Sequence, residues 1–176
     1  PEEPTNPFSP PGAITAAAGV GLFFDPERLP RREIQRLGAE TAALTHGDPA
    51  AFLSAAALSH IISRIVWDRE IRLEKLAGET GAMLKKRFGR EYRQAAEVSA
   101  KLLMVRTLAK SEKFTRAEAL EQLGRDTAAQ VLAGALYCCL TGEREYLAGL
   151  LESEKWYHDT YVRHQECYGG PLDIDK

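Results

Sequence analysis

The sequence is poor in cysteine and has no long apolar run. Its 176 residues include 3 Cys, two of them adjacent, which is too few for the disulfide framework of a small secreted protein. No window reaches the roughly 18 uninterrupted apolar residues of a transmembrane helix. Nothing near the first residue resembles a signal peptide. We therefore expect one soluble, cytoplasmic domain with no membrane partner.

The chain also has almost no net charge. It holds 23 Lys and Arg against 25 Asp and Glu. Proteins that bind nucleic acids or anionic membranes usually carry a basic excess, because their partners are polyanions. We therefore expect no nucleic-acid partner.

Common catalytic motifs and strand signals are missing as well. The sequence contains no Gly-x-x-x-x-Gly-Lys, no Gly-x-Ser-x-Gly and no His-Glu-x-x-His, which leaves P-loop, α/β-hydrolase and zincin chemistry without support. No run alternates apolar and polar residues in the way a half-buried strand does, and no Asn-Gly or Asp-Gly turn joins two β-rich runs. These absences predict an all-α fold.

What is present is a succession of helical signals. Two stretches, Pro49–Trp67 and Ala128–Leu140, are apolar nearly all round and are predicted to be buried hub helices of a multi-helix bundle. We divide the chain into a proline-rich arm or loop over 1–12, a helical domain over 13–154 and an aromatic and polar tail over 155–176.

Capping residues predict where several helices begin. Asp48 before Pro49 is a strong start signal, because the carboxylate accepts unpaired amides and proline loses no hydrogen bond at the first helical position. Thr115 predicts the start of a short helix that Gly124 ends. Asp68 is predicted to cap the helix that follows the first hub.

Several apolar residues are expected inside the core. Ala13–Phe24 is almost wholly small or apolar and predicts a short buried helix. Leu44 completes the apolar stripe predicted for a helix over 31–44. Cys138 and Cys139 lie on an apolar helix and are predicted to be small buried hydrophobic residues.

Two pairs of segments carry a likeness to one known family. The first pair is Ala18-Gly-Val-Gly-Leu-Phe-Phe24 with Ala42-Ala-Leu-Thr-His-Gly-Asp-Pro-Ala50. The second pair is Ala119-Leu-Glu-Gln-Leu-Gly124 with Ala129-Gln-Val-Leu-Ala-Gly-Ala-Leu-Tyr-Cys-Cys-Leu140. In order and spacing they resemble the ADP-ribosylglycohydrolase family over roughly Gly12 to Leu151.

The resemblance implies an all-α, multi-helix fold and a hydrolytic reaction. In the complete family a pair of Mg²⁺ ions positions ADP-ribose and a water for cleavage of a glycosidic bond, and oxygen ligands suit Mg²⁺. The implied partners are ADP-ribose or an ADP-ribosylated protein. The other partner that we expect is a protein or a missing part of the same chain.

The sequence departs from the family where the metal ligands should be. It has neither the Thr-Asp-Asp-Thr run nor the Gly-Asp-x-Asp-Thr/Ser run, and Glu152-Ser-Glu-Lys-Trp-Tyr-His-Asp-Thr160 stands where the second is expected. We therefore expect no metal ligand, no catalytic residue and no bound Mg²⁺ from this chain alone. Since Pro1 stands in place of Met, we expect either a fragment or a degenerate full-length protein.

The resemblance implies three contacts to ADP-ribose. They are His46, in the Thr-His-Gly-Asp-Pro string, and Gly12 and Ala13, in a loop whose family pattern Gly-Asn-Gly-x-x-Met-Arg is degenerate here. The alternative for His46 is a histidine that satisfies carbonyl groups at a helix end. The alternative for Gly12 and Ala13 is a plain helix start.

Three functions remain open at this point. The chain is an ADP-ribosylglycohydrolase-like protein or fragment, inactive alone, or a non-catalytic helical scaffold that binds a nucleotide or a protein partner. The third is an unrelated α-helical interaction domain, because alanine-rich helices resemble one another easily.

Overall fold

The computed structural model describes residues 10–142, and this part of the chain is helical without a strand. The all-α prediction is therefore confirmed. The segments 1–9 and 143–176, which include the tail over 155–176, lie outside the described residues. The elements are a 3₁₀ turn η1 (Pro11–Ile14), α1 (Ala17–Phe23), α2 (Arg31–Ala43), α3 (Pro49–Trp67), α4 (Leu73–Phe88), α5 (Gln94–Lys110), α6 (Arg116–Leu123) and a helix over Ala128–Gly142.

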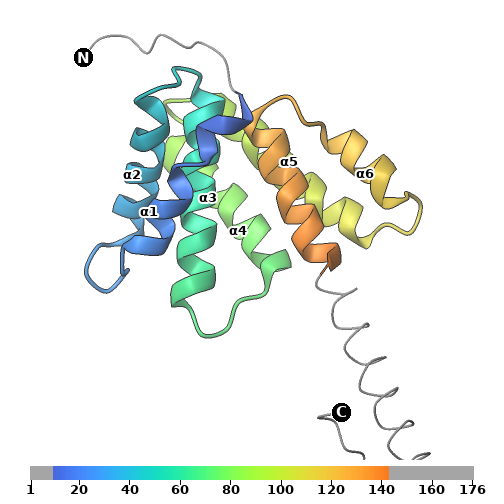
Figure 1. Ribbon diagram of the computed structural model, residues 1–176, viewed down its shortest axis with the longest axis horizontal. Helices are drawn as coiled ribbons and strands as arrows, with labels where there is room; N and C mark the ends of the chain where they lie inside the picture. Colours follow the sequence, from blue (N-terminus) through green and yellow to red (C-terminus); the bar gives the residue numbers. More distant parts are fainter. Residues whose placement is uncertain (1–9, 143–176) are drawn as a thin grey trace, which may run out of the picture. The chain divides into compact units, whose positions relative to one another are not determined.

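The helix α3 is the centre of the bundle. It packs against η1, α1, α2, α4 and α5 (Figure 1). Its length and hydropathy would also allow it to cross a membrane, but 61% of its most apolar window is buried inside the described bundle, as in the core helix of a folded domain. The helix Ala128–Gly142 buries one face. The residues of that face are Ala128, Ala129, Leu132, Ala133, Leu136, Tyr137 and Leu140.

Small residues let α1, α2 and α3 approach closely at Ser59. The Ser59 hydroxyl is buried and donates to the carbonyl of Ala17 in α1 at 2.9 Å. A Cβ on Gly21 would lie 2.6 Å from the Ser59 carbonyl oxygen, and a Cβ on Gly38 would lie 2.1 Å from the Ser59 hydroxyl. Larger side chains at these two glycines would therefore separate the helices. We call Gly21, Gly38 and Ser59 the glycine–serine junction.

Two of the three predicted helix caps, Asp48 and Thr115, are confirmed. Asp48 accepts a hydrogen bond from the Ala50 amide at 2.8 Å and begins α3. Thr115 and Glu118 form a reciprocal capping box at the start of α6. Gly124 ends that helix with a φ of 81°, a left-handed conformation that favours glycine.

Two burial predictions near the start of the chain are wrong. The predicted buried helix over Ala13–Phe24 consists of η1 and α1, and α1 buries only Ala17 and Gly21, while Phe23 is 80% exposed. Leu44 is 81% exposed, because it lies just past the last residue of α2. The buried face of α2 instead follows helical spacing through Ile34, Gln35, Gly38, Ala39 and Ala42.

Two further predictions about single residues fail for tertiary reasons. Asp68 does not begin α4, because it ends α3 and pairs with Arg31 and Arg64. Cys139 is exposed and Cys138 half-buried, because the buried face of their helix passes through neighbouring positions.

Candidate functional site

His46 lies in the short connection between α2 and α3. Its backbone N–H donates to the carbonyl of Ala42 at 2.9 Å, and the Thr45 N–H donates to the same carbonyl at 3.1 Å. The Thr45 hydroxyl lies 2.8 Å from the His46 Nδ1 atom. The backbone therefore closes the end of α2, while the threonine fixes one side of a half-buried imidazole.

Gly12 and Ala13 lie in η1, which packs against α3. Ala13 is buried, and its N–H donates to the Pro10 carbonyl at 3.1 Å. Gly12 is exposed, and a Cβ added to it would meet nothing within 4 Å. The fold itself therefore does not require a glycine at this position.

The three residues predicted to bind ADP-ribose share one end of the bundle. Both η1 and the α2–α3 connection lie at the end where α3 begins (Figure 1). The described hydrogen bonds of His46 are local to its own connection. The structure thus gathers the two segments at one end of α3 and leaves their ligand contacts as a prediction.

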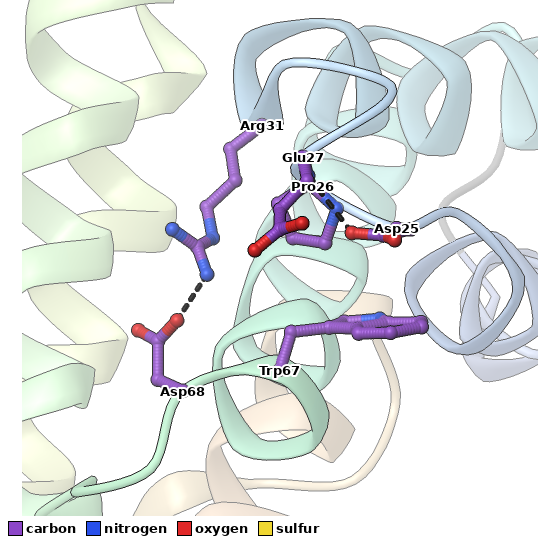
Figure 2. A pocket seen from close by; sticks show the side chains of 6 residues that line it. All are labelled: Asp25, Pro26, Glu27, Arg31, Trp67 and Asp68. Carbon is purple, nitrogen blue, oxygen red and sulfur yellow. Dashed lines mark hydrogen bonds and ion pairs between the residues drawn. The ribbon is translucent and has the colours of Figure 1, made fainter.

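A pocket lies at the opposite end of α3, beside the α1–α2 connection (Figure 2). Its volume is about 450 Å³. The Trp67 ring, 41% exposed, lies across from the turn that begins at Asp25. Arg31 pairs with Asp68 at the edge of the same pocket. The lining residues are Asp25, Pro26, Glu27, Arg31, Trp67 and Asp68.

The sequence interpretation missed this pocket. The sequence predicts Asp68 only as a helix cap, and a capping signal does not say which distant segment lies nearby. The pairing of Arg31 with Asp68 joins positions 37 apart in the chain. No local pattern carries that information.

A second, more apolar pocket of about 700 Å³ lies between α6 and the helix Ala128–Gly142. Its lining includes Leu120, Val131 and Gly134, with Arg125 and Asp126 beside Gly124. Neither this pocket nor the one beside Trp67 includes the connection between α2 and α3.

Gln35 and His60 form a buried polar contact between α2 and α3. Gln35 Nε2 lies 2.9 Å from His60 Nδ1, and the two residues are only 4% and 6% exposed. Burial lowers the pKa of His60 from 6.5 to about 4, and the positive charges of Arg64 and Arg31 act in the same direction. His60 is therefore neutral at pH 7.

The described residues do not supply a metal centre. Between residues 10 and 142, no three His, Cys, Asp or Glu side chains gather in a way that could hold an ion. Asp25 and Asp68 line one pocket, but Asp68 is shared between Arg31 and Arg64. The donor set of this part of the chain therefore does not fit a pair of Mg²⁺ ions, which take mainly oxygen ligands. Asp159, Asp173 and Asp175 lie outside the described residues.

Comparison with known proteins gives one result for this chain. The family model described as ADP-ribosylglycohydrolase matches residues 1–159. No curated protein and no solved structure matches. The matched range includes the helical domain predicted from sequence and both hub helices.

Proposed function

The chain belongs to the ADP-ribosylglycohydrolase family, and from this membership we propose that it is the helical scaffold of a hydrolase acting on ADP-ribosylated protein side chains. The observation that carries the proposal is the family match over residues 1–159. The all-helical architecture of residues 10–142 agrees with it.

We further propose that residues 1–176 do not hydrolyse this substrate by themselves. The family depends in general on divalent metal ions, and its reaction needs oxygen ligands to hold them. Both ligand-bearing runs are missing from the printed sequence. The described residues offer no cluster of donors that replaces them. A metal-dependent step is therefore not assigned to any residue of this chain.

The isolated chain is expected to give no detectable release of ADP-ribose from ADP-ribosyl-arginine in the presence of Mg²⁺. The physical reason is the missing donor set, and chromatography of the products measures the outcome. A family member that carries both aspartate runs is the positive control. Turnover by this chain at a rate near that of the control would contradict the proposed inactivity.

We propose that the end of the bundle where α3 begins retains contacts to ADP-ribose. His46 offers a half-buried imidazole held by Thr45, and η1 brings the backbone of Gly12 and Ala13 to the same end. An imidazole and a short stretch of backbone can provide hydrogen bonds to ribose or phosphate groups.

Calorimetry with ADP-ribose tests this site on the full chain. We expect His46→Ala to weaken binding by about tenfold, since a hydrogen bond to a charged group is lost. Gly12→Ala should also weaken it, because the added methyl would meet the ligand while the fold leaves that space open. Gly19→Ala, where an added Cβ also meets nothing, is the matched control and should bind as the parent does.

The alternative is a non-catalytic scaffold that binds a nucleotide or a protein partner. The degenerate loop at Gly12 and the missing aspartate runs favour it. ADP-ribose binding that His46→Ala weakens would indicate a retained nucleotide site, and no heat at all would favour a protein partner. We also propose a cytoplasmic location and neither nucleic acid nor membrane as partner, on the balanced charge and low cysteine content.

A further inference from the structure

Gln35 connects a buried histidine to an arginine at the surface. On one side its Nε2 atom lies 2.9 Å from His60 Nδ1. On the other side its Oε1 atom accepts a hydrogen bond from Arg87 near the end of α4. The same Arg87 nitrogen donates to the Arg32 carbonyl at 2.6 Å. The amide thus links α2, α3 and α4.

The chemistry of Arg87 fixes the orientation of this amide. A guanidinium has only donors, so the group of Gln35 that faces it must be the carbonyl oxygen. The NH₂ group must then face His60, and His60 Nδ1 must accept the bond. The histidine is consequently neutral with its proton on Nε2.

Protonation of His60 would break this arrangement. A protonated imidazole donates from both nitrogens, so Nδ1 would face an NH₂ group with two donors opposed. Turning the Gln35 amide over would give His60 the oxygen it needs. The same turn would present NH₂ to Arg87, because Gln35 has only one carbonyl oxygen.

We propose that Gln35 is a proton-controlled coupler: when His60 takes up a proton, the amide turns over and Arg87 loses its Gln35 acceptor. Of its two hydrogen bonds to α2, Arg87 then keeps the one to the carbonyl of Arg32, beside the negative charge of Glu33. The attachment of the last turn of α4 to α2 therefore weakens in acid.

Charged groups from the neighbouring elements influence the pH at which His60 takes up its proton. Arg31 of α2 and Arg64 of α3 disfavour a positive charge on His60, while Glu79 of α4 and Asp68 after α3 favour it. Burial outweighs both carboxylates, and the pKa of His60 falls to about 4. The coupler is therefore in its Arg87-bound state at neutral pH and changes state only in acid.

Nuclear magnetic resonance on the full ¹⁵N-labelled chain tests the proposal through two side chains. The His60 ring nitrogens report its protonation, and the Arg87 guanidinium protons report their hydrogen bonds through exchange with water. Because guanidinium exchange is base-catalysed and slows in acid, the Arg87 rate is divided at each pH by that of free arginine. We expect this ratio to rise about fivefold on loss of one hydrogen bond, with the same midpoint as the His60 titration.

The Gln35→Glu variant provides a second test of the proposed coupling between His60 and Arg87. A carboxylate has acceptors on both sides, so it can serve protonated His60 and Arg87 together. We expect the His60 midpoint to rise by about 1–3 pH units, as for an ion pair, and the Arg87 exchange ratio to stay constant through the His60 titration. If the Arg87 exchange ratio of the parent chain does not change as His60 takes up its proton, the proposal is overturned. This test stands even if the variant fails to fold.

Discussion

Replacing Gly21 with alanine is expected to lower the free energy of unfolding by about 1–3 kcal/mol, the usual cost of overpacking. The new Cβ would lie 2.6 Å from the Ser59 carbonyl oxygen and 2.8 Å from the Ile62 Cβ. Both atoms belong to or adjoin the backbone of α3, so no flexible side chain can move aside. The helices α1 and α3 must separate instead.

Gly19→Ala is the matched control in the same helix. An added Cβ there meets nothing within 4 Å, and alanine is favoured over glycine in a helix by about 1 kcal/mol. Urea unfolding followed by circular dichroism should therefore move the two variants in opposite directions. Equal urea midpoints for Gly21→Ala and Gly19→Ala would show that the close approach at Ser59 does not affect stability.

Acid is expected to remove about 3 kcal/mol of stability through His60 alone, from the difference between its unfolded and folded pKa values. Its pKa falls from 6.5 to about 4 on folding, because burial opposes the charged form. The unfolded chain thus binds a proton that the folded chain does not. This contribution is fully present above pH 6.5 and is lost as the pH falls toward 4.

The comparison of the parent chain with His60→Asn isolates this effect. An asparagine oxygen can accept from Gln35 where Nδ1 does, yet it does not titrate. Urea unfolding between pH 7 and pH 4 should show a smaller loss of stability in the variant than in the parent. Parallel pH profiles would mean that another group causes the acid sensitivity.

The parts of the fold that sequence could predict are those decided by neighbouring residues. Asp48 with Pro49 and Thr115 with Glu118 begin helices because a cap needs only groups a few positions apart. The start of α3 at Pro49 is predicted for this reason, and the apolar run predicts its end at Trp67. The nearly continuous apolar run over Ala128–Leu140 likewise predicts the helix Ala128–Gly142.

The failed predictions depend on contacts across the bundle. An apolar run placed Phe23 in the core and an apolar stripe placed Leu44 there, but both side chains are exposed, and Leu44 lies past the last residue of α2. Asp68 has the sequence context of a helix cap, but in the fold its carboxylate pairs with Arg31. Gln35 and His60 are ordinary polar residues in the sequence, and only the packing of α2 on α3 gives them a shared role.

The candidate site likewise has one part that the sequence could predict and one part that it could not. The string Thr45-His-Gly-Asp-Pro49 was visible in the sequence because the family carries it as a contiguous motif. The pocket beside Trp67 was not visible, since its lining joins the α1–α2 connection to the end of α3. The ligand contacts of His46, Gly12 and Ala13 stay predictions.

The glycine–serine junction has a consequence for how this sequence can change over evolutionary time. Three helices converge on Ser59, and each approaches it with almost no spare volume. Growth at Gly38 therefore requires shrinkage at Ser59, so the effects of substitutions there are not additive. At Gly38, a larger residue is therefore expected to be accepted only together with a smaller residue at Ser59.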